Sequence, residues 1–418
     1  MLYPYPMNFQ TRMRRIYDFL KPYQSIWQNE IMLLYPNCFE SFPSDWLDEI
    51  SQINDISQLV QLEKKYYQGI VNNKELVEFY EQIEELSLFP RSQELPPLPE
   101  DKFTWIKVIP KKQHEIKKLA PLINDFYQSQ QVERIIDIGG GIGLLSQTLA
   151  KAYQLKITSL DMDPTLQETG RVRYARYGHQ EVELEFKKVK VSRNEDAFLK
   201  ELHPQRMTMG LHTCGPLAVD QIRASAENKL KAIVNLGCCY LKLNGDGEDQ
   251  NISQFSQSFS SPLVMNPFAL TLACGAHRKV SLDSVSFKRK VKFFRYALHI
   301  LLADHYQRPE LTIFGNSSGK DYDGKFSDYV KVQFQKVGFK LAHSDEDLEA
   351  FYQDKLPTVQ RMYSAGFIRD ALSRLLEVYL LLDRAIYLEE QGYEVKIWEV
   401  FDEDISPRNL GIFAHLKT

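Results

Sequence analysis

The chain has 418 residues, which is enough for two or three domains of ordinary size. Hydrophobic residues make up 44% and aromatic residues 12% of it, so a sizeable core is expected and disorder does not dominate. A net charge of −4 does not mark a general nucleic-acid-binding protein, although it leaves room for a local basic patch.

Cysteine usage and hydropathy both favour an intracellular protein. The five cysteines are an odd number and lack the spacing of a disulfide framework, which suggests a reducing compartment. No apolar run reaches about 18 residues, so no membrane span is expected. The first fifteen residues lack the apolar core of a signal peptide. These features predict a cytoplasmic protein without a membrane anchor.

The first 95 residues predict a helical region that carries no catalytic signature. Apolar residues recur with helical spacing over 12–20, 46–59 and 76–86. A proline-rich stretch at 95–99 (LPPLP) then predicts a semi-rigid linker and a domain boundary.

Residues 132–145 (VERIIDIGGGIGLL) predict the first unit of a nucleotide-binding α/β sheet: a strand, a glycine turn and a helix. The spacing Asp-x-Gly-x-Gly-x-Gly is the form associated with S-adenosylmethionine (SAM). The dinucleotide form is Gly-x-Gly-x-x-Gly, and the register that starts at Gly141 ends on Ser146 instead. This near miss leaves a nicotinamide enzyme open, as well as a merely structural turn. The predicted cofactor contacts in the loop are Asp137, Gly139, Gly140, Gly141 and Gly143.

A second acidic position supports the SAM interpretation. Residues 156–160 (KITSL) predict the second strand, which ends at Asp161, 24 positions after Asp137. A carboxylate there can accept both hydroxyl hydrogens of a ribose. Asp163 is the fallback, and its alternative role is to cap the helix that begins near Pro164. Asp196, after a third strand at 182–191, is a candidate adenine contact, although loop acids are usually only solvated.

Two turns beyond later strands predict the catalytic side of the site. A fourth strand at 207–211 leads into HTCGP at 212–216, and a fifth at 232–236 leads into GCCY at 237–240. Chemistry in an open parallel sheet lies beyond the carboxyl ends of its strands. We therefore predict His212 as a general base, Tyr240 as the residue that orients the acceptor, and Cys239 as a candidate reactive thiol.

The cysteines of these turns leave two further alternatives open. One histidine and three cysteines would suit zinc, yet adjacent cysteines do not easily bind one ion and no Cys-x-x-Cys knuckle is present, so we predict no metal. Small thiols that only pack and shape the substrate mouth are the second alternative.

The rest of the chain predicts a helical insertion followed by the end of the sheet. Residues 243–260 form a long polar loop of the kind that serves as a lid or an insertion. The helix at 287–302 carries the densest basic run, which could guide RNA or an acidic protein or could be a solvated face. A long helix at 362–389 and strands at 393–401 and 409–414 then close the sheet.

These motifs resemble the methyltransferase-like protein 25 family, which includes proteins labelled "ribosomal RNA adenine dimethylase domain-containing". The likeness rests on the glycine loop and on five further stretches: PKKQHE at 110–115, HTCG at 212–215, GCCYLKL at 237–243, LLDRAIYLEEQG at 381–392 and SPRNLGIFA at 406–414. It implies a class I SAM-dependent methyltransferase. Enzymes that methylate amino groups usually carry an Asn-Pro-Pro-aromatic motif after the fourth strand, where this chain has HTCG. Asn266-Pro267-Phe268 is similar to that motif but follows the fifth strand.

Together these observations predict an α/β fold: a Rossmann-like class I methyltransferase sheet with an N-terminal helical region and a helical insertion before the last two strands. The expected ranges are 1–95 for the helical region, 100–242 for the SAM-binding core, 243–390 for the loop and insertion, and 391–418 for the closing hairpin. The predicted function is methyl transfer from SAM to RNA or protein, with no DNA or membrane partner. The alternatives are an inactive scaffold of the same fold and, less favoured, an NAD-dependent oxidoreductase.

Overall fold

The computed structural model describes residues 7–100, 104–178, 182–243, 247–275, 280–312 and 317–417. The chain divides into two compact units. The first comprises residues 1–21, 86–278 and 373–418, and the second comprises 22–85 and 279–372. The N-terminal helical region is therefore split between the units, and the predicted insertion is shared between them as well. Each unit is described by itself below.

The first unit is built on a seven-stranded sheet of order β3-β2-β1-β4-β5-β7-β6. Its strands are Arg134–Ile138 (β1), Ile157–Asp161 (β2), Leu184–Lys188 (β3), Arg206–Cys214 (β4), Ala232–Cys238 (β5), Tyr393–Glu399 (β6) and Leu410–Leu416 (β7). Strands β1 to β5 pair in parallel, whereas β7 runs antiparallel to both β5 and β6. This arrangement confirms the predicted Rossmann-like class I methyltransferase fold.

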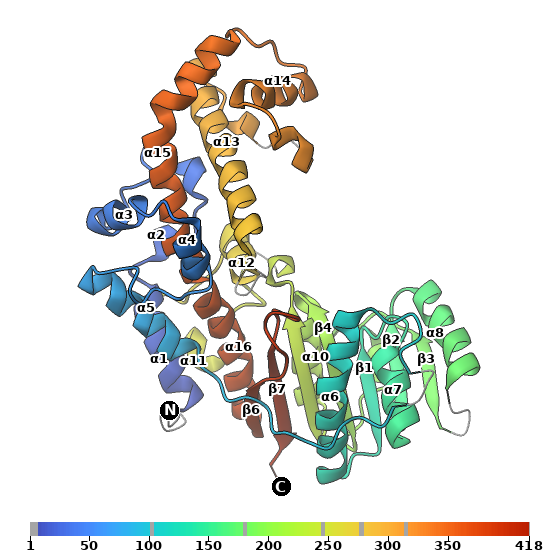
Figure 1. Ribbon diagram of the computed structural model, residues 1–418. Coiled ribbons are helices and arrows are strands. Elements are labelled where there is room, and N and C mark those ends of the chain that lie inside the picture. The colour runs from blue at the N-terminus through green and yellow to red at the C-terminus, as the bar shows by residue number, and fades with distance from the viewer. Residues whose placement is uncertain are drawn as a thin grey trace. The chain divides into compact units, whose positions relative to one another are not determined.

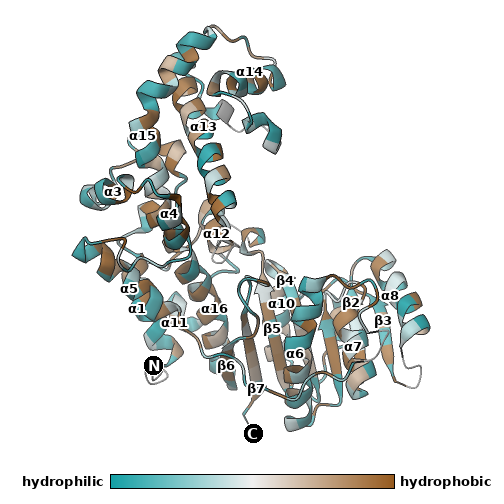
Figure 2. Cartoon of the chain, in the orientation of Figure 1, coloured by the Kyte–Doolittle hydropathy of each residue, from teal (hydrophilic) through white to brown (hydrophobic). Residues whose placement is uncertain are grey.

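Helices cover the sheet on both faces, as its burial pattern requires (Figure 1). The helices of this unit are Phe9–Leu20 (α1), Pro110–Ser129 (α6), Leu144–Tyr153 (α7), Pro164–Tyr177 (α8), Asp196–Leu199 (α9), Pro216–Glu227 (α10), Tyr240–Lys242 (η2), Gln254–Gln257 (α11), Pro267–Ala273 (α12) and Ser373–Glu390 (α16). Ile135 packs in a cluster with residues of α6 and α7, whereas the neighbouring Ile136 packs in a second cluster with α9 and α10. Successive side chains of a strand point to opposite faces, so both faces are buried. Figure 2 shows the matching hydrophobic colour along the strands.

Two strands extend further than the sequence pattern predicts. β4 continues through Cys214 and β5 through Cys238, because Thr213 pairs with Gly237 and Cys214 with Cys238 in the ladder. The cysteines at these two positions therefore sit in strand ends rather than in free turns.

The described part of the predicted polar loop, 247–260, is held against α16 of the same unit. Residues 244–246 lie outside the described part of the chain. Beyond them, Asp383 of α16 accepts hydrogen bonds from the backbone amides of Ile252 and Ser253 and from the hydroxyls of Ser253 and Ser256, at 2.7–3.0 Å. A buried carboxylate with four donors anchors this segment to α16.

The second unit is helical. Its helices are Gln24–Trp27 (α2), Ile31–Leu34 (η1), Ser44–Ser51 (α3), Ile56–Glu63 (α4), Lys74–Ser87 (α5, whose last two residues pass into the first unit), Leu282–Tyr306 (α13), Pro309–Thr312 (η3), Gly319–Tyr322 (η4), Phe326–Lys336 (α14) and Asp345–Ala371 (α15). The single helix expected at 362–389 is two helices, α15 and α16, which part at Leu372. Each belongs to a different compact unit, but residues on both sides of the break are buried, so the apolar pattern of the sequence continues across it.

Candidate functional site

The glycine turn connects β1 to α7 at the carboxyl edge of the sheet. Gly139, Gly141 and Gly143 all adopt positive φ, at 65°, 58° and 68°. Glycine occupies this left-handed region at no steric cost, whereas other L-residues are strained there. The turn therefore needs glycine at alternate positions, as the spacing predicts.

Two glycines of the turn face different surroundings. A Cβ on Gly140 would lie 2.3 Å from the Ser159 hydroxyl and 2.7 Å from an Asp137 carboxylate oxygen, so its glycine is required by packing. A Cβ on Gly141 would meet nothing within 4 Å. The turn is thus packed against the sheet at Gly140 and open at Gly141, where a ligand can approach the main chain.

Asp161 lies at the end of β2, directly beside this open face. One of its carboxylate oxygens accepts the Gly141 amide hydrogen at 2.9 Å, and the other accepts the Asp163 amide hydrogen at 2.9 Å. Each oxygen keeps a further lone pair for another donor. The carboxylate is therefore fixed by two backbone amides and half-buried, which suits it to hold a diol.

Asp163 has a different task. Its side chain accepts the amide hydrogens of Thr165 and Leu166 and so caps the N-terminus of α8. Capping was the alternative role considered for this residue, and the geometry supports it over ribose binding.

Asp137 is buried beneath the turn and receives a hydrogen bond of 2.5 Å from the Ser146 hydroxyl. Burial raises its pKa to about 6, although the Ser146 hydrogen bond acts in the opposite direction. Its contacts join β1 to the first turn of α7. This favours ordering of the loop over direct contact with a ligand, the two roles predicted for it.

Asp196 is exposed in the first turn of the short helix α9. Within the part of the chain that the structure describes, no contact ties Asp196 to the glycine turn, so its assignment to adenine stays a prediction.

His212 stands at an irregularity of β4. The ladder with β5 shifts register between Leu211 and Thr213, and His212 takes a positive φ of 66°. A bulge of this kind re-aims a side chain at the end of a strand. The strain of a left-handed histidine is the type of feature that concentrates at functional sites.

A buried carboxylate orients the His212 ring. Glu115 of α6 lies 2.9 Å from His212 Nε2, accepts the Ser406 hydroxyl hydrogen at 2.8 Å and forms an ion pair with Lys112 at 2.9 Å. Although burial opposes it, the His212 hydrogen bond and the charges of His212 and Lys112 lower the pKa of Glu115 to about 2. The Glu115 carboxylate favours the tautomer in which Nε2–H donates to it, and in that tautomer Nδ1 is the acceptor atom of the ring.

Sequence reasoning missed Glu115 and Ser406 as members of this group. Both lie within stretches that carried the family likeness, PKKQHE and SPRNLGIFA, but α6 and the turn before β7 are almost three hundred positions apart in the chain. Only the fold brings Ser406 and His212 to the Glu115 carboxylate.

A second buried network holds the β4–β5 ends in place. The Asn235 amide donates to the Thr213 hydroxyl at 3.1 Å and to the Gln221 side-chain oxygen at 2.8 Å. Gln221 in turn donates to the Val234 carbonyl at 3.0 Å. These polar groups are buried and joined by hydrogen bonds, so they fix the backbone on which His212 sits, although Asn235 Oδ1 itself accepts no hydrogen bond from the described residues.

Tyr240 does not have the placement that its predicted role needs. The side chain is 1% exposed, and the Arg384 guanidinium lies over its ring at 5.3 Å. A buried ring in this packing has no surface to offer an acceptor. The physical reason is that the chain turns into η2 directly after β5 and packs against α12, while Arg384 of α16 lies over the Tyr240 ring.

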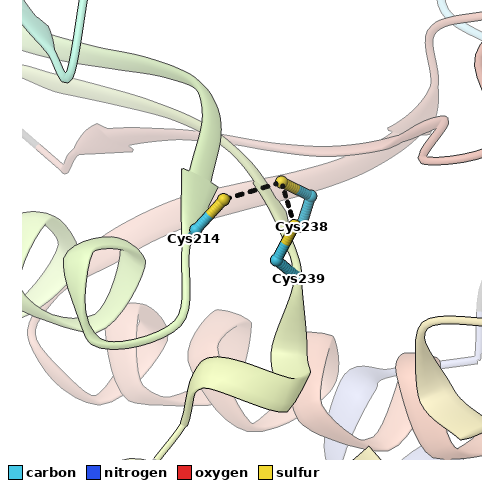
Figure 3. A group of neighbouring side chains, drawn as sticks. All are labelled: Cys214, Cys238 and Cys239. Carbon is cyan, nitrogen blue, oxygen red and sulfur yellow. Dashed lines mark hydrogen bonds between the residues drawn. The ribbon is translucent and has the colours of Figure 1, made fainter. Parts of the chain in front are cut away.

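Three cysteines converge where β4 and β5 end (Figure 3). Cys214 Sγ lies 3.3 Å from Cys238 Sγ, which lies 3.5 Å from Cys239 Sγ. A hydrogen bond from Cys238 is the main cause that lowers the pKa of Cys214 to about 6, and the pKa of Cys238 is raised correspondingly. Burial raises the pKa of Cys239, which makes Cys214 the better thiolate of the three.

The basic run at 287–302 belongs to α13 in the helical unit. Lys288 pairs with Glu63 at 2.9 Å, Arg289 donates to Gln360 at 3.0 Å and the Lys292 ammonium donates to the Tyr296 hydroxyl at 3.2 Å. These cations are half-buried and serve the packing of their own unit. The face of α13 that was expected to be solvated therefore largely contacts other residues of the helical unit.

Comparison with known proteins finds a family that matches the region around the glycine turn. Residues 111–246 match the model of a family described as "Methyltransferase domain". The matched region includes the glycine turn, Asp161, His212 and the cysteine cluster, so the predicted cofactor and catalytic positions all fall inside it.

The chain is also similar to two curated proteins named "Probable methyltransferase-like protein 25". It is 27% identical to the Homo sapiens protein over 227 residues and 26% identical to the Mus musculus protein over 226 residues. Each match covers 50% of this chain and 37% of the relative, so the likeness reaches well under half of the relatives' length. The comparisons confirm the resemblance to this family that the motifs suggest.

Among the residues that the structure describes, we find no helix that combines the length and the apolar character needed to cross a membrane.

Proposed function

We propose that the methyltransferase domain uses SAM as its methyl donor. The observation that carries the proposal is the pairing of an open glycine with a fixed carboxylate: Gly141 faces free space, and its amide is tied to Asp161. A main chain that a ligand can approach closely, next to a carboxylate that accepts hydroxyl hydrogens, suits the amino-acid and ribose parts of SAM.

The residues present fit this cofactor. The turn at 139–143 would hold its methionine part and Asp161 its ribose, while Asp137 and Gly140 keep the turn in shape from beneath. When bound, SAM supplies an electrophilic methyl group. The residues of the chain then have to place the acceptor atom in line with that methyl group and to keep it from binding in other orientations.

His212 is the proposed base for an acceptor that must lose a proton. It lies at the end of β4, the strand next to β1, and thus at the same edge of the sheet as the glycine turn. Glu115 holds the ring through Nε2 and keeps Nδ1 available to take the proton. Cys239 remains a candidate thiol at the same edge. Tyr240, being buried, is not retained as an orienting residue.

The proposed acceptor is an RNA or a protein. The relatives carry only the word "probable" in their names, so the acceptor has to be identified directly. We also propose a cytoplasmic location, which the free state of all five cysteines supports.

The test is a transfer assay with methyl-labelled SAM and the purified chain, on extract from cells that lack the protein. A labelled product that disappears after RNase treatment assigns an RNA acceptor, and one that disappears after protease treatment assigns a protein acceptor. The His212→Gln variant should lower the rate by about 10²-fold or more if the acceptor loses a proton in the step. The absence of any labelled product would favour the alternative of an inactive scaffold.

A further inference from the structure

The cysteine cluster at the carboxyl ends of β4 and β5 has the composition of a metal site. The sulfurs of Cys214, Cys238 and Cys239 all lie within 4.8 Å of one another. Cys238 is buried, and the other two are half-buried. They are free thiols, and thiolates are preferred ligands of zinc.

The fold explains how Cys214 comes to lie beside Cys238, 24 positions further along the chain, and how the adjacent Cys238 and Cys239 share one site. Cys214 and Cys238 are direct partners in the β4–β5 ladder, so their side chains leave the sheet side by side. Cys239 would point to the opposite face if the strand continued. Instead it adopts a left-handed conformation, with φ 48° and ψ 50°, and its sulfur returns to 3.5 Å from Cys238.

This conformation removes one of the two objections that the sequence raised against a metal. The prediction of no metal rested on the adjacency of Cys238 and Cys239, because neighbouring side chains usually diverge, and on the lack of a Cys-x-x-Cys knuckle. A left-handed residue that is not glycine costs free energy, and such strain is kept where it serves a site.

We infer that Cys214, Cys238 and Cys239 bind one Zn²⁺ ion through their thiolates. Three thiolates about 2.3 Å from a tetrahedral zinc lie roughly 3.8 Å from one another. The separations of 3.3 and 3.5 Å and the limit of 4.8 Å for the whole set reach this geometry with small side-chain rotations.

Three protein ligands leave one position of the tetrahedron for another donor. Structural zinc is closed by four protein ligands, whereas three ligands and an open position are typical of catalytic zinc. The cluster also occupies the edge of the sheet that carries the glycine turn, with β4 next to β1 and β5 one strand further. The open position is thus available to water or to a donor atom of the acceptor. The inference of a zinc site itself does not depend on the proposed use of SAM.

The test measures metal directly in the full chain. The protein is reduced, freed of metal with a chelator, checked for folding by circular dichroism, and titrated with Zn²⁺. We expect one zinc per chain by elemental analysis, with at least micromolar affinity. Titration with Co²⁺ should give the thiolate charge-transfer absorption and the intense visible bands of a tetrahedral site.

Matched serine variants separate the site from a general effect of cysteine loss. Cys214→Ser and Cys239→Ser should each weaken zinc binding at least tenfold and reduce the charge-transfer absorption. Cys274→Ser and Cys38→Ser, outside the cluster, should bind like wild type. Equal loss in these controls would overturn the assignment.

A measurement on the unmutated chain guards against variants that fail to fold. Stoichiometric zinc should slow alkylation of Cys214 and Cys239 at least tenfold, as read by mass spectrometry, and leave that of Cys274 unchanged. The inference is overturned if the reduced wild-type chain binds no zinc, if zinc protects none of the three thiols, or if Cys214 and Cys238 are found joined as a disulfide in protein purified without oxygen.

Discussion

At the scale of single residues, the site depends on a few groups that each have one assigned task. Gly140 is packed against Ser159 and Asp137, Gly141 is open, and Asp161 ties the open amide to the end of β2. Asp163, two positions further, only caps α8. Asp161 and Asp163 therefore have different roles although they are close in the chain, and substitutions can distinguish these roles.

Asp161→Asn should weaken SAM binding about 10- to 100-fold, because a charged acceptor of hydroxyl hydrogens is replaced by a neutral amide. Asp163→Ser is the matched control: serine also caps helices, so its affinity should stay within about twofold of wild type. Isothermal titration calorimetry with SAM checks both variants. If Asp163→Ser loses more affinity for SAM than Asp161→Asn does, the ribose is held by Asp163 and the proposed assignment to Asp161 is wrong.

At the scale of elements, one buried carboxylate joins three segments that are distant in the chain. Glu115 of α6 contacts His212 at the bulge of β4 and Ser406 in the turn between β6 and β7. The pKa of Glu115 is lowered to about 2, so the folded chain binds its proton less tightly than the unfolded chain does. Its contribution to stability is complete above about pH 4.5 and is lost as the pH falls toward 2.

The wild-type chain should therefore lose stability between about pH 4.5 and pH 2 more steeply than Glu115→Gln, which has no charge to lose there. The difference should be on the order of 2–3 kcal/mol over this range. Urea unfolding at several pH values in this window measures it. Parallel pH profiles for the two proteins would show that Glu115 is not held ionised by its neighbours.

The basic helix α13 gives a second prediction at this scale. Lys288 pairs with Glu63 inside the helical unit, so Lys288→Ala should destabilise the chain by about 0.5–1 kcal/mol. The exposed Arg295 is the control, and Arg295→Ala should change stability by less than about 0.5 kcal/mol. Thermal unfolding compares them. If Lys288→Ala leaves the stability unchanged but weakens binding to RNA in a filter assay, the basic residues of α13 form a binding face.

Sequence patterns predicted the elements and the cofactor turn well, because both follow from local rules. The short apolar runs of β1 and β2, the glycine spacing and Asp161 all depend on neighbours within about 30 positions. The burial of Tyr240 and the Glu115–Ser406 contact depend on α16 and the closing hairpin, which lie more than a hundred positions away from the residues concerned. No local pattern carries that information. The left-handed turn at Cys239 was hidden for a related reason, since a positive φ is not typical of cysteine.

At the scale of the whole molecule, the two compact units cut across the order of the sequence. The sheet unit takes in helix α1 from the start of the chain, while residues 22–85 group with 279–372. The division between 95 and 100 that the proline-rich stretch predicts does not separate the units, since 86–278 is continuous in the first of them. Every residue assigned to SAM or to the cysteine cluster belongs to this first unit.

Hydrogen–deuterium exchange can test this assignment across the whole chain. Saturation with SAM should slow amide exchange in peptides that cover the glycine turn and the end of β2, residues 134–163, and leave 282–306 and 345–371 unchanged within error. Protection confined to those helices of the second unit would place the ligand elsewhere.

The most direct test of the central claim is a calorimetric titration of SAM into the wild-type chain and the Gly141→Asn variant. The Gly141 Cβ position is open and asparagine tolerates the positive φ of this residue better than most side chains, so the variant should keep the fold by circular dichroism, while its side chain occupies the space proposed for the cofactor. The account predicts measurable binding of SAM by the wild type and at least a tenfold loss in the variant, with NADH bound by neither. Equal affinity of the two proteins for SAM, or tight binding of NADH by the wild type, would contradict it.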